Sequence, residues 1–561
     1  MKALEYIVPL LETTMLTTAL WFAALGPLAL AYAGLIRPAG DERSSCSTTL
    51  KRASWAAMLA CAAALATGAA VISNGALHTG TIGVAGVGFG LYLDTLSALM
   101  YALVSFIGTI VLLYSRNYMD GDPGQGRFVR RLAVTLAAVL LLIVSGNLFQ
   151  LTLAWLATSL GLHGLLVFYR DRPAGLLAAR KKFLLSRLGE ICLVLAMVLI
   201  HRSFGSLDYR VVFSGVDALR AAGPAPGSIQ VAGILLVGAA LFKSAQFPLH
   251  GWLIEVMETP TPVSALLHAG IINAGGFLIL RFAGLISLSV HALDLLVIVG
   301  ALTALFGSLV MLTQTSVKVS LAYSTIAQMG FMMLQCGLGA FSAALLHIVA
   351  HSLYKAHAFL SSGSVIDIAR ASWSPSPSGR PHPARMILAI IAVLGVAVGV
   401  GTLFGATLSA KPGVFALGAI VLLGLVHLLA NSIDERPSIY VIGRTLALAV
   451  LVALAYFGLQ WTAEWLLAGS LPATEALRGP LDGFIIAAVV VAFAALTLFQ
   501  SLLSWAPGPS SWHALYAHVS NGFYLNTIAN RWILRFWPAA SRRALPLAAA
   551  NVNNAIAGSK S

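Results

Sequence analysis

A lysine follows one of the most apolar stretches of this sequence. Lys243 comes two residues after the run 231–241, which consists only of apolar residues and glycine. An ionisable side chain inside a bilayer costs about 2.5 kcal/mol or more, so such residues persist mainly where they serve a function. Pro248 removes a helical hydrogen-bond donor and is expected to break the helix. Because backbone groups freed at membrane depth need protein or a water-filled cavity, we predict a broken helix whose lysine lies beside such a cavity.

A lysine in this position can accept and release a proton as the charges around it change. The candidate carboxylate partner is Glu190, which lies one predicted span earlier. Two alternatives stay open. Lys243 can extend to the membrane surface and act only as an anchor. Glu190 can pair with Arg187, which precedes it by three residues on the same helix.

Basic residues recur at every fourth position later in the chain. His347, His351 and Lys355 form one stripe along a helix that is otherwise mostly apolar. Imidazole titrates close to working pH, so the stripe suits a proton relay along a file of water molecules. Two histidines at this spacing also occur in metal sites, but no glutamate follows the first one as in HExxH, and no cysteine is near. We therefore predict a proton pathway here and no metal.

The composition requires these residues to be held by membrane-spanning helices. The chain has 561 residues, of which 59% are hydrophobic and only 10% charged. That balance is typical of a polytopic membrane protein and excludes a soluble enzyme with a single anchor. Its four cysteines contain no CxxC pair, so neither a disulfide framework nor a zinc–thiolate site is predicted.

The apolar segments predict an all-α polytopic membrane protein with about 15 transmembrane helices, at least one of them broken. The first span is expected to be retained, because its apolar stretch is too long for a cleaved signal. The predicted spans are 9–36, 53–73, 91–113, 130–147, 148–169, 181–202, 230–257 (the broken helix), 261–284, 290–313, 316–338, 342–368, 385–407, 412–430, 438–460 and 482–505.

Lysines and arginines are concentrated in one set of alternate loops. These loops lie near 37–52, 116–131, 170–182, 370–385 and 436–444, and the C-terminal tail belongs with them. Basic loops stay in the cytoplasm, so we predict an external N-terminus and a cytoplasmic C-terminus. The net charge of +14 then reflects topology and contact with the lipid bilayer, and nucleic-acid binding is not expected.

The central part of the chain resembles a known family. Lys243-Ser-Ala-Gln-x-Pro-Leu-x-x-Trp252, followed by Thr259-Pro-Thr-Pro-Val-Ser-Ala-Leu-x-His-Ala269, is similar to the antiporter-like, proton-translocating subunits of respiratory complex I and the multisubunit cation/proton antiporters. The segments 93–119 and 314–355 agree with it in order and spacing. The resemblance implies the antiporter-like fold and adds His268 and Lys318 to a chain of protonatable groups that lies halfway through the membrane and continues from Lys243. Lys318, near a span end, can equally be an interfacial anchor.

The resemblance divides the chain into segments. We expect N-terminal helices over 1–90 and the proton-translocation core over 91–370. A cytoplasmic loop follows over 371–385, with further helices over 386–506. The segment 507–561, which interleaves aromatic and basic residues, is predicted to be an interfacial or cytoplasmic tail.

The sequence departs from the family at two places. Relatives carry a glutamate directly after a tryptophan in the fifth span, as the partner of the broken-helix lysine, whereas Leu156 follows Trp155 here. Relatives in complex I also carry a second broken helix with a lysine. Here the segment 386–408 is apolar throughout, and Lys411 is the nearest base. The usual ion pair and the usual outward half-channel are therefore both in question.

The shortened C-terminus, with its segment 513–524, resembles the membrane subunit of bacterial DAB inorganic-carbon accumulation complexes. The resemblance implies a subunit of the bacterial inner membrane that passes cations, in particular protons. It also implies a cytoplasmic zinc-containing partner similar to a β-carbonic anhydrase. No cofactor is expected, and any catalysis belongs to the partner. The alternatives are a proton-pumping subunit of an NADH:quinone oxidoreductase- or hydrogenase-like complex, and a scaffold with a non-conducting path.

Overall fold

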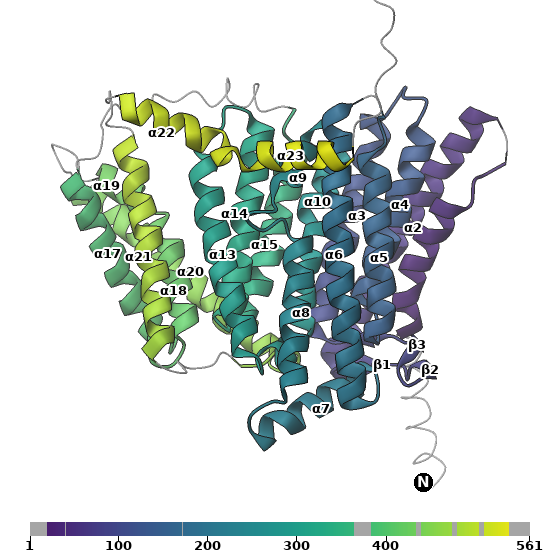
Figure 1. Ribbon diagram of the computed structural model, residues 1–561, viewed down its shortest axis with the longest axis horizontal. Coiled ribbons are helices and arrows are strands. Elements are labelled where there is room, and N and C mark those ends of the chain that lie inside the picture. The colour runs from purple at the N-terminus through teal and green to yellow at the C-terminus, as the bar shows by residue number, and fades with distance from the viewer. Residues whose placement is uncertain are drawn as a thin grey trace, which may run out of the picture.

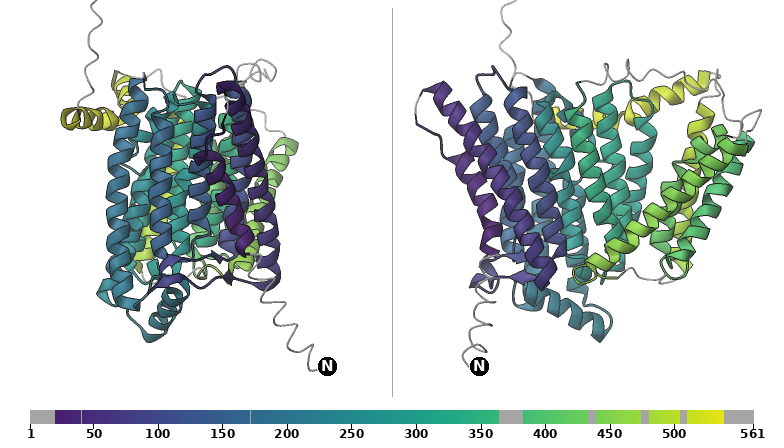
Figure 2. Two further views of the ribbon diagram at one scale, coloured as in Figure 1. Left: turned by 90° about the vertical axis from the view of Figure 1, so that its right-hand side faces the viewer. Right: turned by 180° about the vertical axis from the view of Figure 1, so that it is seen from behind.

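Long helices stand side by side across the whole protein (Figures 1 and 2). The computed structural model describes residues 20–39, 41–170, 172–363, 383–432, 439–473, 480–503 and 510–537. Within them, eight helices are long and apolar enough to cross a membrane, and four shorter apolar helices accompany them. The chain is thus a multi-pass helical membrane protein, as predicted. The total of about 15 spans stays a prediction.

The helical elements follow the predicted spans closely. They are a helix over Leu20–Leu35, α2 (Glu42–Asn74), α3 (Thr95–Tyr118), α4 (Gln125–Ile143), α5 (Leu148–Leu166), α6 (Pro173–Phe204), α7 (Tyr209–Ala222), α8 (Gly227–Lys243), α9 (Gly251–Glu255), η1 (Val256–Glu258), α10 (Thr261–Ala269), η2 (Ile271–Asn273), α11 (Ala274–Arg281), α12 (Ala283–Ile286), α13 (Val290–Met311), α14 (Val317–Gly337), α15 (Phe341–Leu360), α17 (Pro383–Leu403), α18 (Pro412–Leu423), α19 (Val426–Ser432), α20 (Ile439–Leu467), α21 (Pro480–Leu503), α22 (Ser510–Ser520), η3 (Gly522–Tyr524) and α23 (Leu525–Phe536).

Two small antiparallel ribbons close the lower edge in Figure 1. β1 (Leu77–His78) pairs with β4 (Tyr92–Leu93), and β2 (Ile82–Val84) pairs with β3 (Val87–Phe89). Ala85 and Gly86 both have positive φ at the tip of the β2–β3 hairpin, which is the turn geometry that suits a twisted ribbon. A side chain at Gly86 would meet the backbone of Asp208, so the hairpin packs directly on the start of α7.

Helix breaks occur where the sequence supplies glycine, proline or polar residues. α8 ends at Lys243, and the next helical turn begins only at Gly251, so the predicted break is present. A second interruption, which the sequence did not predict, separates α10 from α11 at Gly270. α17 runs unbroken from Pro383 to Leu403, as its apolar sequence predicts.

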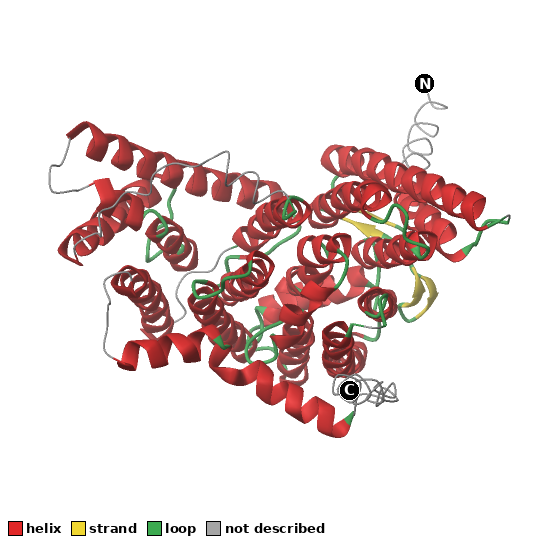
Figure 3. Ribbon diagram, turned by 90° about the horizontal axis from the view of Figure 1, so that it is seen from above, coloured by secondary structure: helices red, strands yellow, loops and turns green. Residues whose placement is uncertain are grey.

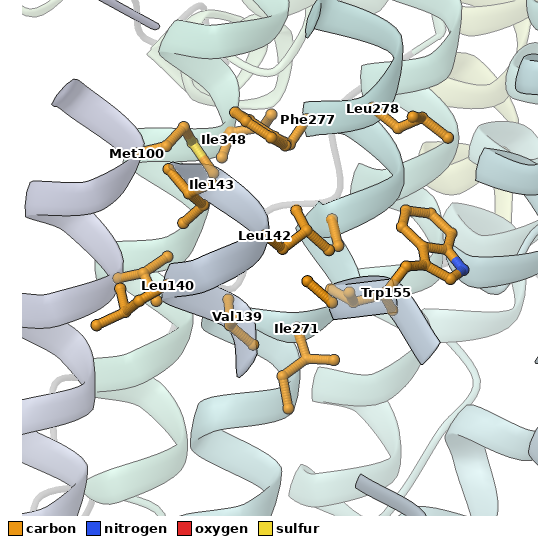
Figure 4. Packing of buried hydrophobic residues seen from close by; sticks show 14 of the residues in the cluster. Met100, Val139, Leu140, Leu142, Ile143, Trp155, Ile271, Phe277, Leu278 and Ile348 are labelled. Carbon is orange, nitrogen blue, oxygen red and sulfur yellow. The ribbon is translucent and has the colours of Figure 1, made fainter. Parts of the chain in front are cut away.

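The apolar interior forms two main clusters. The larger cluster joins the N-terminal helices to α15, and Figure 4 shows part of it, where Trp155 lies near Leu142 and Ile271. The second cluster unites α17–α20, with side chains of α21 packed against it. In Figures 1 and 3 the helices α17–α21 accordingly form a group at one end of the molecule.

The two edges of the bundle differ. α22 and α23 run along the upper edge in Figure 1, whereas α7 and the ribbons lie at the lower edge. α7 occupies a segment that the sequence assigned to no span. Most of the predicted loop 371–385, the first part of the span 9–36 and the end of the tail lie outside the described residues.

Candidate functional site

Lys243 is the last residue of α8 and is buried, with 6% of its surface exposed. Within the described residues its Nζ has no hydrogen-bond partner. Instead, it lies 4.5 Å from the centroid of the Trp155 ring, which α5 supplies. A cation over an indole face is stabilised by about 2 kcal/mol when water is excluded. The indole ring is thus the group that contacts the Lys243 ammonium, and Leu156 stands at the next position, where the relatives were expected to have a carboxylate.

Glu190 lies on α6 and forms an ion pair with Arg187, in which Glu190 Oε1 lies 2.7 Å from Arg187 Nη2. The alternative that the sequence left open is therefore realised in this structure. Glu190 nevertheless remains within electrostatic range of both Lys182 and Lys243. It is a nearby countercharge for Lys243 but not its direct hydrogen-bond partner.

Lys182 is a site residue that the sequence analysis missed. It was counted among the basic loop residues, but α6 begins at Pro173 and carries Lys182 into the interior, where only 3% is exposed. Its Nζ donates to the backbone oxygen and the Oγ of Ser159, at 2.7 and 2.8 Å. Lys182 and Lys243 line the same small cavity of about 10 Å³, which is close to the space of one water molecule.

Buried polar side chains connect this cavity region with α15. Ser244, directly after Lys243, donates to the carbonyl of Ile272 at 3.2 Å. Asn273, which follows Ile272, is 1% exposed and donates from Nδ2 to Ser352 Oγ at 2.8 Å. Ser352 adjoins His351 on α15. Asn273 was not predicted, although an amide within the apolar and glycine-rich segment 269–276 could have indicated it.

In the predicted stripe on α15, His351 and Lys355 are buried and His347 is half-buried. Lys355 is fully buried and donates to the carbonyl of Leu321 on α14 at 3.0 Å. His268 comes from α10, bonds Thr325 Oγ1 through Nδ1 at 2.9 Å and stacks on Phe359. The rings of His347 and His351 have centroids 6.0 Å apart. The structure therefore brings these four predicted residues together around the α10–α14–α15 contact.

A cavity of about 670 Å³ lies beside the stripe. Its lining is mostly apolar, and its polar members include His347, His351, Gln335, Tyr456 and Thr497. In the described part of the chain, the Nε2 atoms of both histidines and Gln335 Oε1 are buried without a hydrogen-bond partner. Since unpaired buried polar atoms are costly, this cavity suits ordered water.

Lys318 lies near the start of α14, close to the upper edge of the bundle, and is half-buried. Its Nζ is 3.4 Å from Thr261 Oγ1, a long contact at the beginning of α10. Lys318 precedes Leu321, whose carbonyl accepts from Lys355, by one helical turn. It can serve either as the upper end of the stripe or as an interfacial anchor.

The segment after Pro248 binds the C-terminal strap, which we define as residues 510–537. Glu255 ends α9 and forms an ion pair with Lys181 at 2.7 Å. Asn526 and Asn530 of α23 bridge this pair, because each donates to Glu255 Oε1 and accepts from Lys181 Nζ. The broken helix is thus fixed from the upper edge by residues that lie 271 and 275 positions after Glu255 in the chain.

These contacts can move a proton between side chains and water, since they combine lysine, histidine, amide and hydroxyl groups. Among the described residues, no group of three or more His, Cys, Asp or Glu side chains is placed to hold a metal ion.

Two family models match the chain. Residues 145–373 match the membrane domain described as NADH:quinone oxidoreductase/Mrp antiporter, and residues 81–129 match the N-terminal part of chain 5 of NADH-ubiquinone oxidoreductase. A similar solved structure is the Mrp complex from Dietzia sp. DQ12-45-1b, at 25% identity and a TM-score of 0.55, covering 97% of this chain and 59% of that one. The membrane-bound sulfane sulfur reductase, an archaeal respiratory complex, shares the fold at 18% identity and a TM-score of 0.56, covering 91% of this chain and 99% of that one.

The similar sequences point to a narrower group. "Probable inorganic carbon transporter subunit DabB2" of Halothiobacillus neapolitanus is 40% identical over 81% of this chain and 82% of the relative. "Probable inorganic carbon transporter subunit DabB" of Hydrogenovibrio crunogenus is 40% identical over 79% and 82%. NADH-quinone oxidoreductase subunit L of Mycobacterium tuberculosis is 38% identical over 56% and 52%. With its antiporter-like fold, its two model matches and relatives of this coverage, the chain belongs to the DabB family of inorganic carbon transporter subunits, within the antiporter-like family of complex I and Mrp membrane subunits.

Proposed function

We propose that this subunit conducts cations, most simply protons, through a pathway that begins at Lys243 and continues through the stripe on α15. The observation that carries the proposal is a buried lysine at a helix break, resting on Trp155 and not held in a direct ion pair within the described residues. An unpaired charge of this kind is costly in a membrane and is expected to be functional. The hydrogen bond from Asn273 to Ser352 continues the buried polar groups to α15, the helix that carries the histidines.

We propose further that the ion flow energises the accumulation of inorganic carbon. The names of the DabB relatives support this output, and the buried groups described above offer no bond-making chemistry of their own. The partner is a cytoplasmic zinc protein of the β-carbonic anhydrase type, which hydrates CO2 to bicarbonate. Inward movement of one positive charge yields about 2.3 kcal/mol per 100 mV, which is enough to bias a hydration that runs close to equilibrium.

The test of the pathway is substitution of Lys243. We expect Lys243→Ala to insert and assemble normally but to abolish ion transport and inorganic carbon uptake, because the proton-exchanging group is gone. Lys243→Arg should fail as well, because guanidinium stays charged throughout. Lys51→Ala, at an exposed lysine of α2, is the matched control and should remain active. Full activity of either Lys243 variant would contradict the proposal.

The test of the output is purification of the subunit from native membranes. We expect a soluble zinc protein to co-purify, and cells that express both chains to accumulate inorganic carbon until the ion gradient is collapsed. The respiratory alternative predicts a different result, in which flavin and iron–sulfur subunits co-purify with quinone reductase activity. That outcome would overturn the proposed role in inorganic carbon accumulation but would leave the proposed role of Lys243 in ion transport intact.

A further inference from the structure

A row of polar side chains follows one face of α20. Tyr456, Gln460 and Glu464 recur at every fourth residue, so they lie above one another on the helix. Their backbone positions span about 12 Å along the axis, at 1.5 Å per residue. The surrounding helix is apolar, with Phe457 buried against α17–α19. Polar residues at this spacing inside an apolar span need partners or a function.

The lower end of the row reaches the lower edge of the bundle. Glu464 forms an ion pair with Lys411, the residue that directly precedes α18. Their side chains are 19% and 31% exposed, so the pair is partly open to the surroundings. Gln460 donates from Nε2 to Glu464 Oε1 at 3.2 Å. The acid is thus joined to the next polar residue of the row.

The upper end of the row reaches the cavity beside the stripe. Tyr456 lines the same 670 Å³ space as His347 and His351. Tyr456 OH and Gln460 Oε1 are both buried and lack a hydrogen-bond partner among the residues that the structure describes. Gln460 itself is only 2% exposed. These two unsatisfied oxygens lie between an ion pair and a cavity that two histidines line, and water is expected to bind at such oxygens.

We propose that α20 carries the second half of the ion pathway, connecting the histidine cavity with the lower face of the membrane. The inference rests on the proposed function and names the opening at the lower face that the unbroken α17 does not supply. A proton bound by the Glu464 carboxylate passes to water held by Gln460 and Tyr456 and then to a histidine ring nitrogen, and Glu464 is left ionised beside Lys411. Movement in the opposite direction uses the same groups.

The first experiment measures transport by variants of the row together with Lys243→Ala. Glu464→Gln keeps the shape and a hydrogen bond to Lys411 but cannot exchange a proton, so we expect transport to fall about tenfold or more. Gln460→Leu should have a similar effect, because it removes the groups that hold water. Asp217→Asn is the matched control, since Asp217 is an exposed carboxylate on α7 at the same face. Each variant is checked for normal assembly by size-exclusion chromatography.

The outcomes separate the two proposals. In one outcome Lys243→Ala is inactive, while Glu464→Gln and Gln460→Leu assemble and transport fully. That result would overturn the path along α20 and leave the proposed function standing. Active Lys243→Ala would overturn the proposed function itself. If Lys243→Ala and the two α20 variants all lose transport while Asp217→Asn keeps it, the result supports a path through both Lys243 and α20.

The second experiment tests whether water reaches the row, and it does not depend on activity. Gln460→Cys should react with a small, charged, membrane-impermeant thiol reagent added at the lower face. Trp461→Cys is its control at the same depth, because Trp461 is 57% exposed on the outer surface of the helix, where it faces lipid. We expect at least a tenfold faster reaction at position 460. Equal, slow labelling at both positions would show a dry helix and would overturn the inference.

Discussion

The contact between Lys243 and Trp155 suggests how this chain works without the family's fifth-span glutamate. An ion pair holds a lysine in its charged form and makes it reluctant to release a proton, whereas a ring face stabilises the cation more weakly. Glu190 is ion-paired with Arg187, so it attracts the Lys243 ammonium electrostatically without bonding it directly. The charged form of Lys243 is therefore stabilised only weakly, so a change in a neighbouring charge or in bound water is enough to make it release its proton.

We predict that Trp155→Leu lowers ion transport several-fold, because it removes the ring on which the ammonium rests, worth about 2 kcal/mol. Trp155→Phe keeps an aromatic face and should retain more activity than the leucine variant. Phe106, an exposed aromatic residue of α3, provides the control Phe106→Leu, which should be neutral. The measurement is proton uptake into proteoliposomes at matched protein content. Equal activity of the Leu and Phe variants would contradict a role for the ring.

Single residues were predictable where their charge conflicts with an apolar sequence. Lys243, His347, His351 and Lys355 stand out for that reason, and the structure buries all of them or their polar atoms. Lys182 was missed because it lies in a basic cluster that resembles a loop. Its burial depends on where α6 begins, which is decided by Pro173 and by packing against α5 and α8. Sequence pattern alone does not fix that boundary.

At the level of elements, the broken helix and the strap form one unit. α9 is too short to be stable alone, so it depends on contacts with its neighbours. Asn526 and Asn530 satisfy both charges of the Lys181–Glu255 pair, using amide groups that donate and accept at once. A further contact holds the strap where α22 ends, because Gln314 Nε2 donates to the carbonyl of Ser520 at 3.0 Å.

We predict that Asn526→Leu combined with Asn530→Leu releases α23 from the bundle. The double variant removes four hydrogen bonds to charged groups. Each costs about 1.5 kcal/mol or more, so docking should weaken by about 6 kcal/mol. Trypsin should then cut much faster at Arg531 and Arg535, which are exposed basic sites on α23. Asn521→Ala, in the same strap but bonded only to a carbonyl within it, is the control. Unchanged cleavage in the double variant would show that other contacts hold the strap.

The helices themselves were largely predictable, because apolar length is a strong signal in membranes. The predicted span 148–169 corresponds to α5, and 290–313 corresponds to α13. α7 was missed because it is amphipathic and lies at the edge of the bundle, outside any continuous apolar run. The interruption at Gly270 was missed as well, since a single glycine is compatible with an unbroken helix.

Across the whole molecule, basic residues collect at one edge. Arg127, Arg172 and Arg180 belong to helix starts at the upper edge in Figure 1, where the strap also lies. Lysine and arginine near helix ends are retained on the cytoplasmic side during insertion. The upper edge is therefore proposed to be cytoplasmic, which places the strap and Lys318 on the side of the proposed soluble partner.

This orientation predicts which surface positions react in intact cells. Asp41 and Asp120 are exposed at the upper edge, whereas Ala76 is exposed beside the ribbons at the lower edge. A cysteine introduced at Asp41 or Asp120 should be shielded from an impermeant thiol reagent until the cells are opened, and one at Ala76 should react at once. The parent protein, whose four cysteines are half-buried or buried, gives the background. The reverse pattern would place the Glu464–Lys411 pair in the cytoplasm and the strap outside, where it could not meet a cytoplasmic partner.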